Sequence, residues 1–472
     1  MSKKTIYDHI DEHFDEHVAK VQELIRQPSI SSEGRGIREC AQLIQGYFEK
    51  LGCVDARLVE TSGNPVAYGE YDAGAKKTVL VYMMYDTMPV DEPGWIVPPL
   101  EGRIVDMAPF GKTLVARGAV NTKGEIRAFL NACESIRSSG QELPVNLIFV
   151  AEGEEEMGSR NLPEFLGKYQ EKLKRANVVF FPLVAQNQNG KVIVELGVKG
   201  IVYFELELDG KDWSKGPTEF GIHGSNKSWV DSPVWRMIQA LATMTSEDGN
   251  QVLIEGFYDD VVPPPTEDEE LLKKLQQTFD EEAIKEELKV KKFINDLHGV
   301  EALKRYLYSP QLNIDGIWAG YTGPGTKTLL PHKVTLKMDV RLVPNMSKEK
   351  PIPLIRRHLD KHGFGEVKIR ILEKGYDWAK TSVRTPAAQA VLRTYREFGF
   401  EPEVWPNIAG SAPFSMFNRA PLNLPFVMGG LGHGARAHSP NEYLVIGEGG
   451  PTAGLPGMEK SFVSILYNLA EM

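Results

Sequence analysis

The sequence predicts an α/β fold, with a mostly parallel, helix-covered sheet and an inserted α+β domain. Two observations support this. Apolar strand-like runs and helical runs alternate through residues 1–197, as they do in βαβ units, and the same rhythm resumes in residues 379–472. Residues 198–378 instead combine strands of alternating polarity with a highly charged helical stretch. We therefore expect one discontinuous domain, 1–197 with 379–472, and one inserted domain, 198–378.

The elements of the first part can be taken in order. Apolar side chains at helical spacing predict one helix around residues 10–25, which Pro28 ends. Gly52 is placed to give the second helix, IRECAQLIQGYFEKLG, a left-handed cap. The next expected elements are the strands PVAYGEY and KTVLVYMMY, the helix GEIRAFLNACESIR, the strand VNLIFVA, the helix LPEFLGKYQEKL and the strand ANVVFFPLV.

The inserted part has a different pattern. GIVYFELELDG alternates like an antiparallel strand, SPVWRMIQALATM is helical, and residues 266–308 form the charged helical stretch. HKVTLKMDVRLVP and EVKIRILEK then alternate again, before TPAAQAVLRTYREFGF and LPFVMGGLG return to the βα rhythm.

Composition excludes several classes of partner. The 472 residues carry a net charge of -10 with the acidic residues spread along the chain, so no basic face is available for nucleic acid or anionic lipid. The cysteines Cys40, Cys53 and Cys133 lack CxxC spacing, which fits a reducing compartment. The first residues have no apolar signal core, and no apolar run approaches the ~20 residues that span a bilayer. We expect a cytoplasmic protein with neither nucleic acid nor membrane as a partner.

Three polar stretches are candidates for chemistry. A carboxylate cluster, Glu152, Glu154, Glu155 and Glu156, directly follows a buried strand, at the sheet edge where open α/β folds hold their ligands, although a charge run can also be a solvated loop. The segment Asn121-Thr122-Lys123 opens a helix between two glycines, which an ordinary N-cap also explains. His433 and His438 in a glycine-rich loop can be ligands, acid–base groups or turn residues.

Together these stretches resemble the family of two-metal exopeptidases and deacylases that includes carnosine dipeptidase, acetylornithine deacetylase and succinyl-diaminopimelate desuccinylase. YDTMPVDEPGW is similar to the family's G-H-x-D-x-x-P segment, RGAVNTKG to R-G-x-x-D-x-K-G, EGEEEMGS to E-G-x-E-E-x-G-S, and AHSPNEYL to H-x-P-N-E. HGSNKSWVDSPVWRM, GYTGPGTKTLLP and MDVRLVP resemble segments of its lid domain. The resemblance covers nearly the whole chain, and length and the helical insert favour the carnosine dipeptidase branch.

The resemblance implies roles for individual residues. Glu155 falls on the general base that activates water, while Glu156 and His438 fall on ligands of the first metal. His223 falls on the lid histidine that crosses a dimer interface to polarise the scissile carbonyl. The resemblance also implies a homodimer formed through the inserted domain.

Further groups are expected around the substrate. Arg341 and Ser411 fall on groups that hold the substrate carboxylate. Lys123 is expected to bind substrate or to offset carboxylate charge. Asp86 falls on the carboxylate that orients a metal-binding histidine, and here it is a relic of that role, a substrate contact or an acid–base group.

The metal positions depart from the family pattern. Met84 stands at the second metal's histidine, Asn121 at the bridging aspartate, and Pro182 near the second metal's other aspartate. A thioether is a soft ligand, a neutral amide bridges two cations poorly and proline offers no ligand, so we predict that the second metal site is lost. Glu156 and His438, with the Asn121 amide oxygen as third ligand, leave one divalent ion, zinc or manganese, or none.

The sequence therefore predicts a hydrolase of an amide or related C–N bond in a small carboxylated substrate, dipeptidase-like or deacylase-like, with Glu155, Asp86 and His223 as its catalytic groups. Without a metal, three neighbouring carboxylates repel, so one is protonated or a substrate ammonium occupies the vacated position. The alternatives are a metal-independent deaminase or lyase, and a non-catalytic dimeric small-molecule-binding protein.

Overall fold

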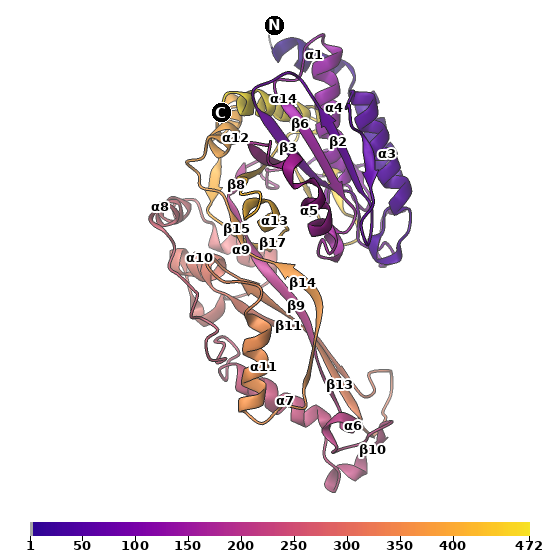
Figure 1. Ribbon diagram of the computed structural model, residues 1–472, viewed down its shortest axis with the longest axis vertical. Coiled ribbons are helices and arrows are strands. Elements are labelled where there is room, and N and C mark those ends of the chain that lie inside the picture. The colour runs from indigo at the N-terminus through magenta and orange to yellow at the C-terminus, as the bar shows by residue number, and fades with distance from the viewer. Residues whose placement is uncertain (1–2) are drawn as a thin grey trace. The chain divides into compact units, whose positions relative to one another are not determined.

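The chain forms two compact units. The computed structural model describes residues 3–472, apart from the side chains at positions 287, 373 and 374. The first unit comprises Met1–Gly197, Lys380–Pro406 and Pro413–Met472, and the second comprises Val198–Ala379 and Asn407–Ala412 (Figure 1). The short segment Asn407–Ala412 thus belongs with the second unit, whereas the sequence pattern predicts it in the first.

A six-stranded sheet forms the centre of the first unit, in the order β1-β2-β6-β3-β7-β18. The four strands from β6 to β18 are parallel, and β1 and β2 add an antiparallel edge. Because helices cover the parallel strands, these read as continuous apolar runs and are almost fully buried. The strands are β1 (Arg57–Val59), β2 (Val66–Tyr71), β3 (Thr78–Met84), β6 (Asn146–Glu152), β7 (Val178–Pro182) and β18 (Phe426–Gly429).

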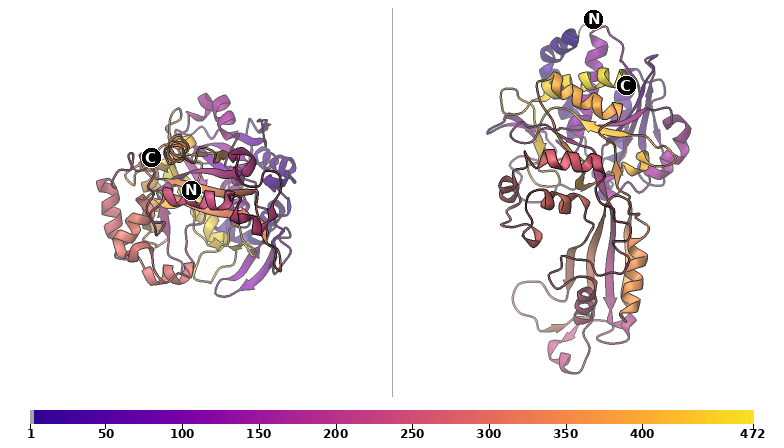
Figure 2. Two further views of the ribbon diagram at one scale, coloured as in Figure 1. Left: turned by 90° about the horizontal axis from the view of Figure 1, so that it is seen from below. Right: turned by 90° about the vertical axis from the view of Figure 1, so that its left-hand side faces the viewer.

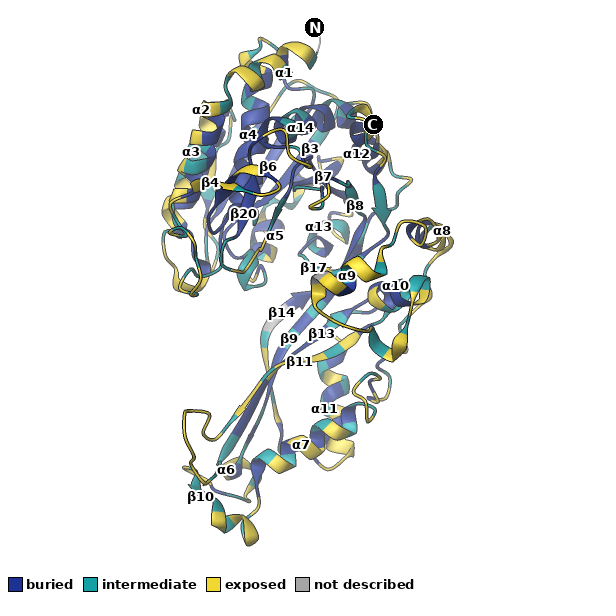
Figure 3. Cartoon of the chain, turned by 180° about the vertical axis from the view of Figure 1, so that it is seen from behind, coloured by how far each residue is buried: buried dark blue, intermediate teal, exposed yellow. Residues whose placement is uncertain are grey.

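Helices surround this sheet. Two of them, α4 and α14, contact each other and are buried along most of their length, while α2 and α3 expose their outer faces (Figure 3). Gly52 caps α3 in the left-handed conformation, with φ 99° and its N–H bonded to Glu49, as predicted. The helices are α1 (Lys3–Glu12), α2 (Phe14–Arg26), α3 (Ile37–Leu51), α4 (Lys123–Ser138), α5 (Leu162–Leu173), α12 (Pro386–Glu397), α13 (Ser415–Asn418) and α14 (Leu455–Ala470).

One expected helix is divided. The apolar spacing predicted a single helix over residues 10–25, but the structure ends α1 at Glu12 and begins α2 at Phe14. The intervening His13 has φ -106° and ψ 20°, outside the helical region, although its N–H still bonds to His9. Ile10 on α1 and Val18, Val21 and Ile25 on α2 remain buried, while Phe14 beside the break is partly exposed, so the periodicity identified the buried face but not the break.

Smaller sheets complete the first unit. An antiparallel sheet runs in the order β19-β20-β5-β4, and the short strands β8 and β16 pair in parallel. Their bounds are β4 (Arg103–Met107), β5 (Gly111–Val115), β8 (Ile193–Glu195), β16 (Glu403–Trp405), β19 (Gly434–Ala435) and β20 (Tyr443–Val445).

The second unit is built on an antiparallel sheet in the order β11-β13-β9-β14, with β15 and β17 also pairing with β9. Buried side chains of β9 and β13 pack against α7 and α11, and α11 lies along this sheet (Figure 2). The strands are β9 (Gly197–Asp209), β10 (Ile222–His223), β11 (Gln311–Ala319), β12 (Leu329–Leu330), β13 (Lys333–Leu342), β14 (Lys368–Tyr376), β15 (Ala379–Lys380) and β17 (Ile408–Ser411). The helices are α6 (Gly210–Trp213), α7 (Pro233–Met244), α8 (Thr266–Leu275), α9 (Glu281–Leu288), α10 (Gly299–Tyr308) and α11 (Pro351–Lys361).

The predicted fold class is confirmed, because a mostly parallel, helix-covered sheet and a separate α+β unit are both present. Cys40, Cys53 and Cys133 are free thiols. Among residues 3–472, no helix is both long enough and apolar enough to cross a membrane.

Candidate active site

The candidate site lies at the carboxyl edge of the parallel strands, where open α/β sheets bind ligands. Met84, the last residue of β3, is in register with Glu152 at the end of β6, and Pro182 at the end of β7 is in register with Gly429 of β18. The strand ends and the loops that follow them therefore bring together three of the motifs found in the sequence.

Asp86 fixes the turn that carries the predicted base. Its side chain is fully buried after β3, and its two carboxylate oxygens accept hydrogen bonds from the backbone N–H groups of Glu155 and Glu156, both at 3.1 Å. Burial, followed by the negative charge of Glu156, raises the pKa of Asp86 to about 7. Asp86 thus acts as a clamp on the 3-10 turn η2 (Glu155–Met157).

The carboxylate cluster divides into two pairs with different environments. Glu152 and Glu154 are buried and accept hydrogen bonds from the surrounding loops, whereas Glu155 and Glu156 belong to a turn without fully buried residues, although the Glu156 side chain itself is only 5% exposed. Burial also raises the pKa of Glu152 to about 8. Glu152 and Glu154 therefore support the loop, and Glu155 and Glu156 lie on the turn η2 that follows it. The supporting donors are Tyr82 at 2.5 Å and Ser159 at 2.9 Å for Glu152, and the backbone N–H groups of Asn64 at 2.9 Å and Asn161 at 3.0 Å for Glu154.

The three predicted ligands of the first metal meet directly. The Asn121 side-chain nitrogen lies 2.6 Å from Glu156 Oε1 and 3.1 Å from His438 Nε2, and His438 Nε2 lies 3.1 Å from Glu156 Oε2. The hydrogen bond to Glu156 raises the pKa of His438. The amide group facing Glu156 is thus the NH2, a donor, and not the oxygen expected as a ligand.

A buried ion pair, to which the sequence motifs alone assign no role, holds the Asn121 loop. Arg117 and Glu442 are almost completely buried and pair at 2.9 Å, and the other carboxylate oxygen of Glu442 accepts the N–H groups of Val120 and Asn121, both at 3.0 Å. Both residues stood inside the quoted motifs, RGAVNTKG and AHSPNEYL, so the signal was present in the sequence.

Two polar candidates are buried and bonded within the protein. Lys123, predicted to bind substrate or to offset carboxylate charge, is 1% exposed in this structure, and its ammonium donates to the Gln27 carbonyl at 2.5 Å. The reason is that the first turn of α4 is buried. His433 is also buried, between the Gln186 carbonyl at 2.9 Å and the Tyr443 hydroxyl at 3.0 Å.

The second unit holds the other predicted groups. Arg341 on β13 donates to Asp339 at 3.0 Å and to Ser411 at 2.8 Å, so the two residues expected to hold a carboxylate are neighbours. His223 is exposed, and its ring nitrogens lie 2.7 Å from Ser225 Oγ and 3.0 Å from Thr328 Oγ1.

The residues present do not fit a two-metal centre. Met84 is 4% exposed and fills the core at the end of β3, and proline at 182 has no donor to offer. Within the described part of the chain, no three His, Cys, Asp or Glu side chains gather as a set that could hold an ion. Glu156 and His438 are two ligands, fewer than the three that a catalytic zinc site takes from protein.

Known peptidases are similar to this chain. Residues 80–453 match the peptidase family M20/M25/M40. The Cys-Gly metallodipeptidase dug1 of Schizosaccharomyces pombe is 26% identical over 467 residues, covering 94% of each chain. The Beta-Ala-His dipeptidase of Homo sapiens is 28% identical over 426 residues, covering 84% of this chain and 80% of its own.

A solved peptidase structure is similar to this chain in both fold and sequence. The M20 family metallo-carboxypeptidase Sso-CP2 from Sulfolobus solfataricus superposes with a TM-score of 0.86 at 34% identity, over 97% of this chain and 100% of its own. These findings confirm a hydrolase of amide C–N bonds in small substrates, and they give no support to a deaminase, a lyase or a non-catalytic binding protein. The chain belongs to the peptidase family M20/M25/M40.

Proposed function

We propose that this protein is a dipeptidase for small substrates with a free carboxylate, and that Glu155 is its general base. The observation that carries the proposal is the Asp86 clamp, because a buried carboxylate that accepts the N–H groups of Glu155 and Glu156 fixes the turn from which Glu155 projects. The names of two similar proteins, a Cys-Gly metallodipeptidase and a Beta-Ala-His dipeptidase, support dipeptides as the substrate class.

In this proposal the protein's own side chains move the proton and hold the substrate. Glu155 takes a proton from the attacking water and returns it to the leaving amine. As the resemblance implies, His223 crosses a dimer interface to polarise the scissile carbonyl, and the Arg341–Ser411 pair, joined at 2.8 Å, binds the substrate carboxylate. Asp86 keeps the base in position through its two backbone hydrogen bonds.

We further propose that the protein binds at most one divalent ion, zinc or manganese, and that no step depends on a second. The hydrogen bonds among Asn121, Glu156 and His438 support this, because an amide NH2 lies where a two-metal site needs a bridging carboxylate. Elemental analysis of the purified protein should give one ion per chain or fewer, before and after incubation with zinc or manganese. Two tightly held ions per chain would show that the substitutions are tolerated as ligands.

The function is tested by turnover. The purified protein, with and without added zinc or manganese, should hydrolyse Cys-Gly, β-Ala-His or a related dipeptide, with release of both amino acids followed by chromatography. N-acyl amino acids in the same panel separate a dipeptidase from a deacylase. Absence of turnover across the panel under every metal condition would contradict the proposal.

We propose in addition that the protein is a homodimer through the second unit. The edge strand β11 exposes the apolar side chains Ile314, Ile317 and Trp318, which are 46%, 53% and 45% exposed. An unpaired edge carrying apolar residues is a surface that soluble proteins normally cover. Helix α7 adds Trp235, which is 60% exposed.

A charge on β11 should prevent this association. Light scattering is expected to give twice the chain mass for the unaltered protein and for Val54→Lys, a matched control that changes an apolar residue 79% exposed in the first unit. Ile317→Lys should give the mass of one chain, because the ammonium would be buried without a partner in the interface. Equal masses for both variants would place the interface elsewhere or exclude it.

A further inference from the structure

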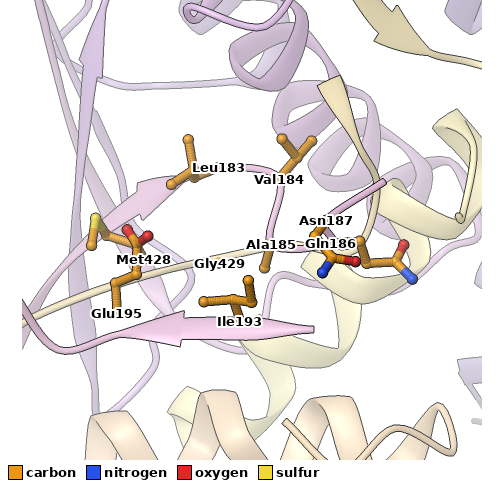
Figure 4. Close-up of a pocket in the computed structure, with 9 residues that line it drawn as sticks. All are labelled: Leu183, Val184, Ala185, Gln186, Asn187, Ile193, Glu195, Met428 and Gly429. Atoms are coloured by element: carbon orange, nitrogen blue, oxygen red, sulfur yellow. The ribbon is translucent and has the colours of Figure 1, made fainter. Parts of the chain in front are cut away.

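A pocket in the first unit lies beside the strand ends that carry the proposed site. Its volume is about 180 Å³, and it lies between the segment that follows β7, the strand β8 and the end of β18 (Figure 4). Leu183, Ile193 and Met428 give it apolar walls. The pocket begins at Leu183, the residue directly after Pro182.

Glu195 is the charged group of this pocket. Its side chain extends from β8 toward Met428 of β18 (Figure 4). In the described part of the chain its carboxylate receives no hydrogen bond and has no ion-pair partner. Burial alone raises its pKa to about 7, because no neighbouring cation offsets the loss of water.

The other polar side chains of the pocket are already bonded within the protein. Gln186 accepts the N–H groups of Gly432 and Ala453, both at 2.9 Å, and donates to the Gly190 carbonyl at 2.9 Å. The Asn187 side-chain oxygen accepts two N–H groups of its own loop at 3.0 Å. Among the described lining residues, Glu195 is therefore the side chain whose acceptor oxygens remain open to a ligand, and the Asn187 NH2, a donor, cannot bind a cation.

The pocket shares its sheet edge with the proposed catalytic residues. It opens at the ends of β7 and β18, and β7 is the direct neighbour of β3, the strand that leads to Asp86. Its first residue follows Pro182, where the resemblance placed a ligand of the second metal ion, a cation. Beside that position lies a partly buried carboxylate that has no counter-charge among the described residues. Such a group can bind an organic cation in place of a metal ion.

We infer that this pocket binds a primary ammonium group of the substrate, with Glu195 as its counter-charge. The inference rests on the proposed function, since it assigns a subsite to the same substrate. The ammonium donates a charge-assisted hydrogen bond to Glu195, and the carbon chain that carries it packs against Leu183, Ile193 and Met428. A cavity of roughly 150 Å³ accommodates a benzene molecule, so this pocket has room for an ammonium and a short alkyl chain.

Binding of a small probe tests the subsite without turnover. Ligand-observed NMR is used to titrate n-butylammonium chloride and butan-1-ol, which share a carbon chain, into the full-length protein. The unaltered protein should bind butylammonium about tenfold more tightly than butanol, because hydrogen bonds to charged groups contribute that much. Glu195→Gln should remove the difference, and Glu195→Asp, which keeps the charge, should restore part of it.

The matched control is Glu403→Gln, on the strand that pairs with β8. Glu403 accepts from Trp405 at 2.9 Å and pairs with Lys191, so this change alters the net charge equally but leaves the pocket intact, and butylammonium affinity should stay within twofold. The inference is overturned if Glu195→Gln binds butylammonium as the unaltered protein does, or if the unaltered protein does not distinguish the two probes. If either result is found and the protein still hydrolyses dipeptides, only the subsite is contradicted. If butylammonium binds as expected but no dipeptide is hydrolysed, only the dipeptidase proposal is contradicted.

Discussion

Glu155→Gln is expected to lower kcat for the preferred dipeptide by about 10³-fold, within the usual contribution of a general base. Gln has nearly the same shape but cannot accept the proton of the attacking water. Asp86 bonds to the backbone N–H of residue 155, so the turn should keep its position in the variant. KM should change little, and steady-state kinetics with both enzymes measures the two parameters.

A matched control is available on the same unit. Glu171 on α5 has an 86% exposed side chain that pairs with Lys174, so Glu171→Gln also removes one negative charge and should leave kcat unchanged. Equal rates for Glu155→Gln and Glu171→Gln would exclude Glu155 as the base and would point to another proton acceptor at the strand ends.

Glu442→Ala is expected to lower the free energy of unfolding by about 3–5 kcal/mol, the usual result of removing one partner from a buried ion pair. The Arg117 guanidinium would keep Glu92 at 2.9 Å but lose its buried partner. The N–H groups of Val120 and Asn121 would lose their acceptor, so the loop that carries Asn121 should loosen as well. Urea denaturation measures the loss of stability.

Two further variants separate the causes. Glu442→Gln keeps an oxygen for the two N–H groups but removes the charge, so it isolates the contribution of the ion pair. Glu101→Gln removes an exposed ion pair with Arg103 and should cost no more than about 1 kcal/mol. A loss for Glu442→Ala no larger than that for Glu101→Gln would show that the buried pair contributes little.

Local sequence predicted the elements and the position of the proposed base. The apolar run before Glu152 predicted a buried strand, and the carboxylates after it were expected at the carboxyl edge of the sheet. The substitutions at Met84, Asn121 and Pro182 could also be recognised in the sequence, because each replaces an expected metal ligand by a residue with different donor chemistry. The break at His13 was not readable, since the apolar spacing continues across it.

The side chains that support the site could not be assigned in this way. Arg117 and Glu442 are 325 residues apart in the chain, and their buried contact forms only when the loop before α4 meets the segment before β20. Lys123 was expected to reach substrate because its motif is polar, but the packing of the first turn of α4 buries it.

The sequence by itself thus determined the fold class and the peptide-hydrolase family, and it predicts the loss of the second metal's ligands, because these depend on residue type and on local spacing. Only the tertiary structure decided that the Asn121 NH2 faces Glu156, that Asp86 clamps the Glu155 turn, and that Glu195 stands in a pocket without a counter-charge. Such features depend on which surfaces meet after folding, and the desolvation and hydrogen bonding that result have no counterpart in the order of residues along the chain.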